Sequence, residues 1–468
     1  MNAKLIRKWS LLGIPLVIGL IGFLVAGTGF LDALFSAISL YGLEIQDTPP
    51  NALVEIARWT APIATATGLL MTLRSVRDSL RNWARYKRGR SVAVYGPEQE
   101  RGEFLKALGR RGIEGHEDFV RAQSYVLLDE EDKNFGFYSK HREKLKGRAV
   151  YIRSSSLQPQ SVLDPELRLF SAEETAARRF WKEHCLYGEA KKADWHLKLV
   201  LIGFGRLGEE LLSRALQYNV FHPGQCIEYH VFGDDGRYPA LHPRLSELED
   251  RVVFHGEPWY GCLGLLEEAG RILVVQQAGQ NGIVADLLQA TLRPKLYVFA
   301  ADTSGTRLLE AQERLVPYPW KKLAQDPDDV LKDRLYDNAK RLNLRYAHVY
   351  GGTAETEENR ERAWAELDGF TRYSNVSAAD YHEIQLRILE EEGVHGSLSE
   401  AWVERFARLE HMRWCRYHWL NNWSLGKPAG GKNKDPQARV HVDLRPYGEL
   451  SEGEKEKDRA NIRLLFSE

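Results

Sequence analysis

The segment LKLVLIGFGRLGEE (residues 197–210) decides the fold of this chain, because it joins an apolar strand to a helix through a glycine turn. Gly203 allows a sharp turn, Gly205 lets the backbone approach a phosphate, and Gly208 lets the helix pack close to the strand. The first N–H groups of such a helix, together with its dipole, favour a bound anion. The segment therefore predicts an α/β unit with a nucleotide-binding turn.

The unit around this turn is expected to span residues 196–355. Further strands are predicted at 226–232, 251–254, 271–276, 295–300 and 344–349, with helices between them. An acidic residue at the end of the second strand of such a unit binds a ribose hydroxyl, and Asp234 or Asp235 stands near that place. NAD or another adenine nucleotide is the expected cofactor, and a purely structural turn is the alternative. The expected cofactor-binding residues are Gly203, Gly205, Arg206, Gly208, Asp234 and Asp235.

Residues 91–195 predict a degenerate copy of the same unit. A strand at 91–96 leads into a turn that keeps only its first glycine, Gly96. Pro97 and Glu98 follow, where a phosphate loop needs small residues, and the carboxylate repels phosphate. We expect a Rossmann-like domain without a nucleotide site, joined to the second unit by a helix over residues 171–184.

Composition excludes several classes of function. The chain has 468 residues, enough for about three domains, and its formal net charge of −1 gives no basic field for nucleic acid. The four cysteines lack the mutual spacing of a metal site and indicate reduced thiols, so no metal ligand is predicted.

The N-terminal 90 residues predict a membrane region. Residues 11–30 carry no charge, and residues 53–73 form a second, weaker apolar stretch. A signal peptide is the competing interpretation of the first stretch, but it is longer than a signal core. Lysines and arginines flank both stretches on their outer sides, which predicts a multi-pass inner-membrane protein with both termini in the cytoplasm.

Residues 31–50, between the expected spans, are apolar and then acidic. Two spans with a half-buried helix between them resemble the two-helix potassium channels, although the filter sequence of that family is absent. Glu44 and Asp47 are the expected acidic rings of a pore mouth. The alternative is an interfacial helix in an anchor that conducts nothing.

The order of these parts resembles the RCK (TrkA-N) regulators of potassium channels and transporters over residues 91–352. Gly203, Gly205 and Gly208 match the nucleotide loop of that family, while residues 254–257 (FHGE) depart from its usual Gly-Asp pair. The resemblance implies a nucleotide ligand and assembly into a homo-oligomer, expected here as a tetramer.

Residues 356–468 are expected to form one domain, and residues 368–468 of it resemble the RyR domain, the repeat of ryanodine receptors that also occurs in bacterial proteins. The motifs that carry this resemblance are LEHMRW (409–414), NWSLG (422–426), HVDLRPY (441–447) and EKEKDR (454–459). It implies a mainly helical module that binds nucleotide-derived signals. The expected ligand cup is Glu410, His411, Arg413, Trp414, Trp423, His441, Asp443, Tyr447, Lys457 and Arg459. Tryptophans buried in a core and solvated salt bridges are the alternative.

Together these features predict an α/β protein with two transmembrane helices, tandem Rossmann-like units and a C-terminal RyR domain. The expected function is a nucleotide-gated channel or pore-forming effector in the lipid bilayer, with antiviral defence as its setting. The alternative is a non-conducting, membrane-anchored nucleotide sensor or scaffold. No catalytic constellation is visible in the sequence, so no enzymatic activity is expected.

Overall fold

The computed structural model describes residues 3–43, 51–116, 118–156, 167–301, 304–307, 313–332 and 334–466. The chain divides into two units. The first comprises Met1–Ser91 with Arg121–Gln123, and the second comprises Val92–Val120 with Ser124–Glu468. Each unit is described by itself.

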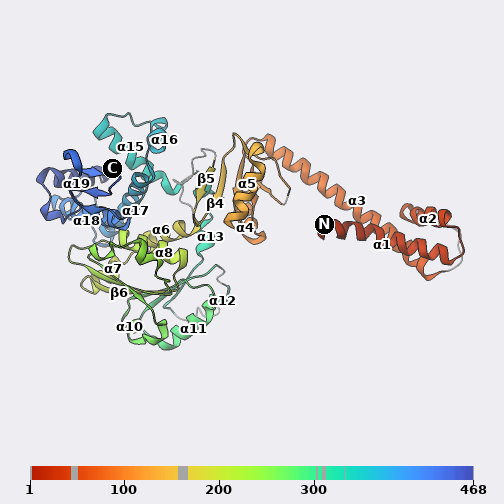
Figure 1. Cartoon of the computed structure of the whole chain (residues 1–468), viewed down its shortest axis with the longest axis horizontal. Helices are drawn as coiled ribbons and strands as arrows, with labels where there is room; N and C mark the ends of the chain where they lie inside the picture. Colours follow the sequence, from red (N-terminus) through yellow and green to blue (C-terminus); the bar gives the residue numbers. More distant parts are fainter. Residues whose placement is uncertain are drawn as a thin grey trace. The chain divides into compact units, whose positions relative to one another are not determined.

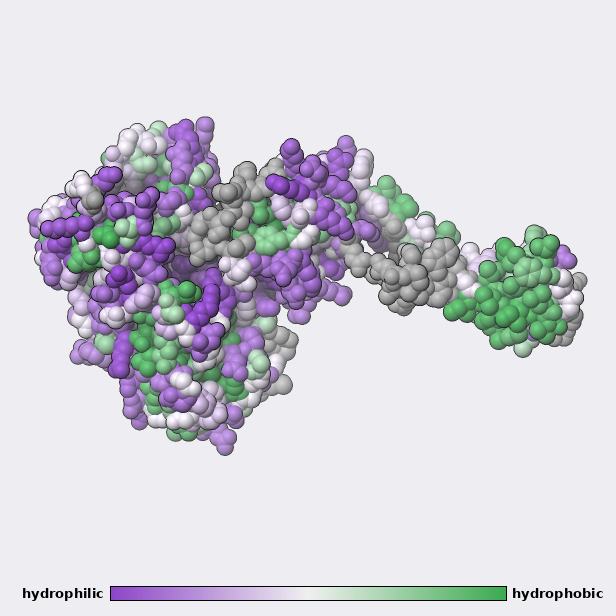
Figure 2. Space-filling view, in the orientation of Figure 1, coloured by the Kyte–Doolittle hydropathy of each residue, from purple (hydrophilic) through white to green (hydrophobic). Residues whose placement is uncertain are grey.

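The first unit is built from helices that pack through small residues. They are α1 (Ala3–Val25), α2 (Phe30–Ser39), the short η1 (Leu40–Gly42) and α3 (Ala52–Lys87). Ala57 and Ala61 of α3 are buried, and a Cβ on Gly22 of α1 would lie 2.8 Å from Val54. Large side chains such as Phe35 and Trp59 are exposed on this unit. Figure 2 shows hydrophobic residues gathered on the surface of its helical end.

The expectation of two transmembrane helices was wrong. Within the described ranges, the structure has no helix with both the length and the apolar character that a membrane crossing requires. The uncharged stretch 11–30 is divided, because α1 ends at Val25 and Gly27 has a positive φ of 89° before α2 begins. In α3, Glu55 and Arg58 interrupt the apolar pattern near its start, and a basic sequence follows its middle.

The expectations that depended on the two spans are withdrawn with them. They are the multi-pass inner-membrane location and the cytoplasmic placement of both termini. The lipid bilayer as partner and the channel or pore stay predictions. The expected helix between the spans exists as α2, but Glu44 and Asp47 lie outside the described residues.

The second unit begins with a parallel five-stranded sheet in the order β2-β1-β3-β4-β5. Its strands are β1 (Val92–Tyr95), β2 (Gly112–Glu114), β3 (Ser124–Leu127), β4 (Val150–Arg153) and β5 (Leu167–Phe170). Helices α4 (Glu98–Leu108) and α14 (Pro327–Lys332) pack on one face and α5 (Glu131–Leu145) on the other. The order 2-1-3-4-5 is that of the flavodoxin-like doubly wound folds rather than that of the Rossmann fold.

A parallel six-stranded sheet follows, in the order β11-β10-β9-β6-β7-β8. Its strands are β6 (His196–Ile202), β7 (Cys226–Phe232), β8 (Arg251–His255), β9 (Arg271–Val274), β10 (Lys295–Phe299) and β11 (Leu315–Tyr318). Numbered within this sheet and read from β8, the order is 3-2-1-4-5-6, that of dinucleotide-binding folds. The second unit therefore contains a Rossmann-type domain, as the glycine turn predicted.

Helices cover both faces of the second sheet (Figure 1). Side chains that point to opposite faces alternate along β6, because successive residues of a strand face opposite sides. Leu199 and Leu201 pack with α6 (Ala172–Glu183) and α8 (Gly205–Tyr218), while Val200 and Ile202 pack with α10 (Leu263–Glu268) and α11 (Gln280–Ala290). The shorter helices are α7 (Tyr187–Lys192), α9 (Arg237–Leu241), α12 (Ser304–Arg307) and α13 (Trp320–Ala324).

The prediction of a strand at residues 344–349 was wrong. These residues belong to helix α15 (Asp337–Gly351), in which Ala339, Lys340, Leu342 and Leu344 are buried. The sixth strand of the sheet is β11 instead, which the sequence did not indicate.

The C-terminal part is mainly helical and shares a core with the second sheet. It contains α15, α16 (Glu357–Ala365), α17 (Gly369–Glu391), α18 (Glu400–Leu420) and α19 (Glu452–Leu465), with short strands β12 (Ser424–Leu425), β13 (Lys434–Asp435) and β14 (Val440–His441). Tyr381 of α17 and Phe406 of α18 belong to the same hydrophobic cluster as Leu211 of α8. The C-terminal helices are therefore built onto the outer side of α6 and α8.

Candidate functional site

A cavity of about 780 Å³ lies between α8 of the second sheet domain and the helices α17 and α18. The loop that carries β13 and β14 forms its rim. Pockets of roughly 300–1,000 Å³ are typical of small-molecule sites. All of these elements belong to the second unit, so the cavity is enclosed by one structural body.

Aromatic side chains form one wall of the cavity. Trp414, Tyr417 and His418 stand on the same face of α18, because residues three and four apart in a helix are neighbours. The rings of Phe370 and Trp423 stack at 4.9 Å, and those of Trp414 and His418 lie 4.0 Å apart. Burial lowers the pKa of His418 to about 3, so this imidazole is neutral at physiological pH.

Charged side chains of α8 form the opposite wall. Arg206, Glu210 and Arg214 follow one another at intervals of four residues and therefore share one face of the helix. Arg206 contacts Glu210 at 3.1 Å, and Arg214 lies 3.6 Å from the same carboxylate and 3.5 Å from Glu174 of α6. Burial raises the pKa of Glu210. Arg214 also lies over the ring of Tyr373, 5.8 Å from its centroid.

Several buried polar atoms around the cavity have no hydrogen-bond partner among the described residues. They are Glu174 Oε1, Arg206 Nε, Arg214 Nε, Gln217 Oε1 and Asn422 Oδ1. The 3.5 Å contact between Glu174 and Arg214 is an ion pair rather than a hydrogen bond of good length. Arg214, Gln217 and Glu174 are only 7%, 4% and 7% exposed. Buried polar groups are nearly always hydrogen-bonded, so these atoms mark positions where the described residues do not supply the partner.

Further charges stand at the rim. Lys434 and Arg439 line the cavity, and both are exposed on the loop around β13 and β14. Arg439 donates a hydrogen bond to the backbone oxygen of Asn421 at 3.2 Å, which ties this loop to the end of α18. Arg206 and Arg214 of the floor are paired with Glu210 and Glu174, and Lys434 and Arg439 add positive charge at the mouth.

The glycine turn lies elsewhere, at the carboxyl end of β6. Gly203 has a φ of 78°, and a Cβ at this position would lie 2.5 Å from the backbone nitrogen of Gln276. Gly205 also has a positive φ, of 51°, but its Cβ position meets no described atom within 4 Å. Gly208 makes room for the ring of Phe204, 2.8 Å from its Cβ position, rather than for the strand as expected.

The acidic residues expected to bind ribose occupy a turn after β7. Asp234 Oδ2 accepts a hydrogen bond from the backbone N–H of Gly236 at 2.7 Å, and Asp235 Oδ1 accepts one from Arg237 at 3.0 Å. Both carboxylates thus hold the turn that begins α9. Of the expected cofactor residues, only Arg206 lines the large cavity.

The residues expected in the C-terminal cup fall into three groups. Trp414, Trp423 and His441 line the large cavity. A second cavity, of about 390 Å³, is lined by Glu410, His411, Arg413, Trp414, His441, Asp443 and Lys457. Tyr447 and Arg459 belong to neither of these two cavities. Trp414 and His441 therefore stand between the two spaces, and the cup is not one site.

Several cup residues already have strong partners. Arg413 is 1% exposed and binds Glu410 through two hydrogen bonds of 2.8 and 2.6 Å. His411 Nε2 donates to the backbone oxygen of Arg445 at 2.9 Å. Burial lowers the pKa of His411, but the Asp458 carboxylate outweighs it and raises the pKa to about 10. Arg459 is held by Glu404 at 2.6 Å. The contacts of His411 with Asp458 and of Arg459 with Glu404 join α18 to α19.

Sequence reasoning missed the residues of α6, α8 and α17 that complete the large cavity. Glu174, Arg214, Gln217 and Tyr373 come from three helices. The four-residue spacing of Arg206, Glu210 and Arg214 was a usable signal, because it places the charges on one face of α8. The approach of α17 to that face was not visible, since it depends on how the helices pack.

Comparisons with known proteins give little beyond the fold. No family model matches the chain, and no curated protein matches it. Among solved structures, the chain is similar to one of the subunits of dipicolinate synthase from Bacillus halodurans, with 14% identity and a TM-score of 0.25, over 52% of this chain and 97% of that one. It is also similar to L-tryptophan dehydrogenase from Nostoc punctiforme, with 14% identity and a TM-score of 0.27, over 71% of this chain and 88% of that one.

These similarities correct one expectation. No sign of an enzyme was visible in the sequence, but both solved structures are of enzymes or their subunits, so the exclusion of enzymatic activity is withdrawn. At these TM-scores the likeness carries no argument for a particular reaction or cofactor. The function must be argued from the site itself.

Proposed function

We propose that this chain is a receptor for a small nucleotide-class ligand, which binds in the cavity between α8, α17 and α18. One observation carries the proposal: several residues with buried polar atoms that have no hydrogen-bond partner in the described structure line the same cavity. Leaving such an atom unpaired costs about 1–3 kcal/mol, which a bound ligand recovers. Because the ligand makes these hydrogen bonds when α8 and α18 enclose it, its binding favours that arrangement of the helices.

The chemistry of the walls defines the ligand class. Trp414 and the stacked pair Phe370 and Trp423 offer flat faces to a heteroaromatic base. Arg206 and Arg214 in the floor, with Lys434 at the mouth, offer donors to phosphate oxygens. Glu174 and Gln217 supply acceptors for ribose hydroxyls or amino groups. A base, a sugar and a phosphate together meet all three requirements.

NAD or another adenine nucleotide belongs to this class and remains the more specific hypothesis. Two places compete for it, the cavity and the glycine turn. Gly205 supports the turn, because the space around it admits a phosphate. The unpartnered polar atoms support the cavity, and we assign the ligand there. The expected homotetramer and the antiviral setting stay predictions.

Calorimetric titration of the full chain with NAD, ADP-ribose, ATP and cyclic di- and oligonucleotides tests the proposal. One of these compounds is expected to bind, and Arg206→Gln is expected to weaken that binding about tenfold through loss of a charged hydrogen bond. Arg206 suits the test because its side chain is 33% exposed and its partner Glu210 keeps a second cation, Arg214.

Gly205→Asp is the matched variant at the competing place. It puts a carboxylate where the turn would hold a phosphate, and it is expected to leave the affinity unchanged. The reverse pattern, loss in Gly205→Asp and none in Arg206→Gln, would move the ligand to the glycine turn. Mass analysis of the recovered ligand shows whether the chain also converts it.

A further inference from the structure

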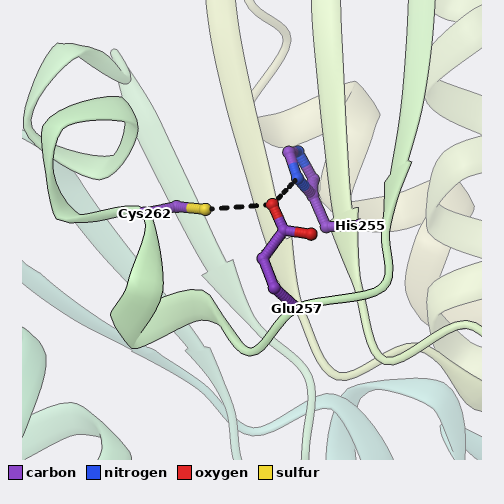
Figure 3. Close-up of side chains that lie close together, drawn as sticks. All are labelled: His255, Glu257 and Cys262. Atoms are coloured by element: carbon purple, nitrogen blue, oxygen red, sulfur yellow. Dashed lines mark hydrogen bonds and ion pairs between the residues drawn. The ribbon is translucent and has the colours of Figure 1, made fainter.

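A separate cluster of metal-binding side chain types lies at the carboxyl end of β8. His255 is the last residue of β8, Glu257 follows two residues later, and Cys262 precedes α10. The chain turns back through η5 (Trp259–Gly261), and this turn brings Cys262 beside Glu257. Figure 3 shows the three side chains pointing toward one another.

The donor atoms of this cluster have the spacing that one ion requires. Glu257 Oε1 lies 3.2 Å from His255 Nδ1 and 3.4 Å from Cys262 Sγ. One donor atom from each residue lies within 4.8 Å of the others. Tetrahedral zinc, with bonds of about 2.0–2.3 Å, holds its donors roughly 3.3–3.8 Å apart. A small movement of the exposed Glu257 or of Cys262 completes that geometry.

A second observation comes from behind the imidazole. His255 Nε2 lies 3.0 Å from Nδ1 of His230, and His230 Nε2 lies 3.2 Å from the carboxylate of Glu228. The ring of His255 also stacks on Phe232 at 4.3 Å. Metal-binding histidines are typically oriented in this way, by a partner on the ring nitrogen that does not bind the metal. The contacts with His230 and Phe232 leave Nδ1 of His255 directed at Glu257 and Cys262.

We propose that His255, Glu257 and Cys262 bind one zinc-class divalent ion, with a fourth position open to solvent. A thiolate and an imidazole favour zinc over magnesium or calcium, which prefer oxygen donors. The Glu257 side chain is 56% exposed, so a water or a ligand atom reaches the fourth position. The site stands at the carboxyl edge of the second sheet, where α/β folds bind their ligands.

The spacing of the cysteines concealed this site in the sequence. Metal sites are usually sought as pairs of cysteines, and Cys262 has no second cysteine nearby in the chain. The local turn supplies one thiol, and the β8 strand end supplies the imidazole and the carboxylate.

The test uses the full chain, stripped of metal with a chelator and then loaded with Co²⁺ as a spectroscopic probe for zinc. We expect one Co²⁺ per chain, a thiolate-to-cobalt charge-transfer band, and displacement of the cobalt by Zn²⁺. Cys262→Ser is expected to abolish that band, while Cys226→Ser, an exchange at a thiol on β7, is expected to keep it.

A variant that changes only the orientation of His255 distinguishes a preformed metal site from nonspecific binding of the metal to a thiol. His230→Gln removes the partner of His255 and leaves all three ligands in place, and it is expected to lower zinc affinity about 10–100-fold. A chain that binds no Co²⁺, a charge-transfer band that persists in Cys262→Ser, or unchanged zinc affinity in His230→Gln would each overturn the proposal. Circular dichroism of each variant shows that it remains folded.

Discussion

The guanidinium of Arg178 on α6 binds the carboxylate of Asp380 on α17 at 2.6 Å, with both side chains buried. Tyr218, at the end of α8, donates a second hydrogen bond to the same carboxylate at 2.7 Å. This contact joins the second sheet domain to the C-terminal helices behind the large cavity. It fixes the distance between the two walls that a ligand would bridge.

Replacing Asp380 by Asn is expected to destabilise the chain. The exchange leaves Arg178 buried without its anion, which lowers the free energy of unfolding by about 3–5 kcal/mol. Chemical denaturation at neutral pH measures this difference. Glu383→Gln on the same helix is the control, because its contact with Lys182 is partly exposed and contributes less than about 1 kcal/mol. Equal effects of the two variants would contradict the structural role of the buried pair.

The same ion pair predicts a loss of stability in acid. Burial by itself raises the pKa of Asp380, but the charges of Arg178 and Lys182 outweigh it and lower the pKa to about 2. The unfolded chain therefore takes up this proton first as the pH falls. The stabilisation is complete above about pH 4 and is lost as the pH approaches 2. Over this range the stability difference between the wild type and Asp380→Asn is expected to shrink by about 2 kcal/mol.

Lys434 at the cavity mouth is expected to strengthen binding of a phosphate-bearing ligand. Lys434→Gln removes one positive charge from the rim and should weaken the affinity a few-fold, an effect that fades at high salt. Lys432→Gln changes an exposed lysine of the same loop that does not line the cavity. Titrations at two salt concentrations compare the variants. A salt-independent effect, or the same effect from both exchanges, would argue against phosphate at the mouth.

Trp414 is expected to provide a stacking face for the base. Truncation of an aromatic side chain that stacks on a base costs about 1–3 kcal/mol, so Trp414→Ala should weaken binding about tenfold or more. Trp402→Ala on the same helix is the control, because Trp402 packs against the hydrophobic core away from the cavity. If Trp414→Ala binds like the wild type while remaining folded, the ring has only a packing role.

Gly203 and Gly205, the first two glycines of the turn, are expected to differ in how well they tolerate a side chain. Gly205→Ala meets open space and only the strain of a positive φ, of about 1–2 kcal/mol. Gly203→Ala adds a collision with the backbone of Gln276 at 2.5 Å and should destabilise the chain considerably more. Thermal unfolding of the two variants compares them, and equal midpoints would contradict the close packing at Gly203.

Local patterns predicted most of the second sheet and the first strand of the other. The glycine turn and the apolar runs that follow it placed β6 to β10, because buried parallel strands appear in a sequence as short apolar segments. The same reasoning failed at residues 344–349, where apolar residues belong to the buried face of α15. It also failed at the N-terminus, since the break at Gly27 cannot be seen in a hydropathy pattern.

The candidate site was less accessible to prediction. Trp414, Trp423, His441 and Arg206 were each chosen from local motifs, and the structure places them around one cavity. Their partners Arg214, Gln217 and Tyr373 were not chosen, because their role arises from the packing of α17 and α18 on α8. The cup residues Arg413 and His411 were predicted as ligand contacts, but their partners within the chain are visible only in three dimensions.

The most direct measurement is a crystal structure of the full chain with the nucleotide that binds it in the calorimetric panel. We expect ligand density between α8 and α18, with the base against Trp414 and the phosphate within hydrogen-bond distance of Arg206 or Arg214. We also expect Gln217 Oε1 and Glu174 Oε1 to accept hydrogen bonds from the ligand. Density at the turn formed by Gly203 and Gly205, with the large cavity free of ligand, would contradict the assignment of the ligand to the cavity.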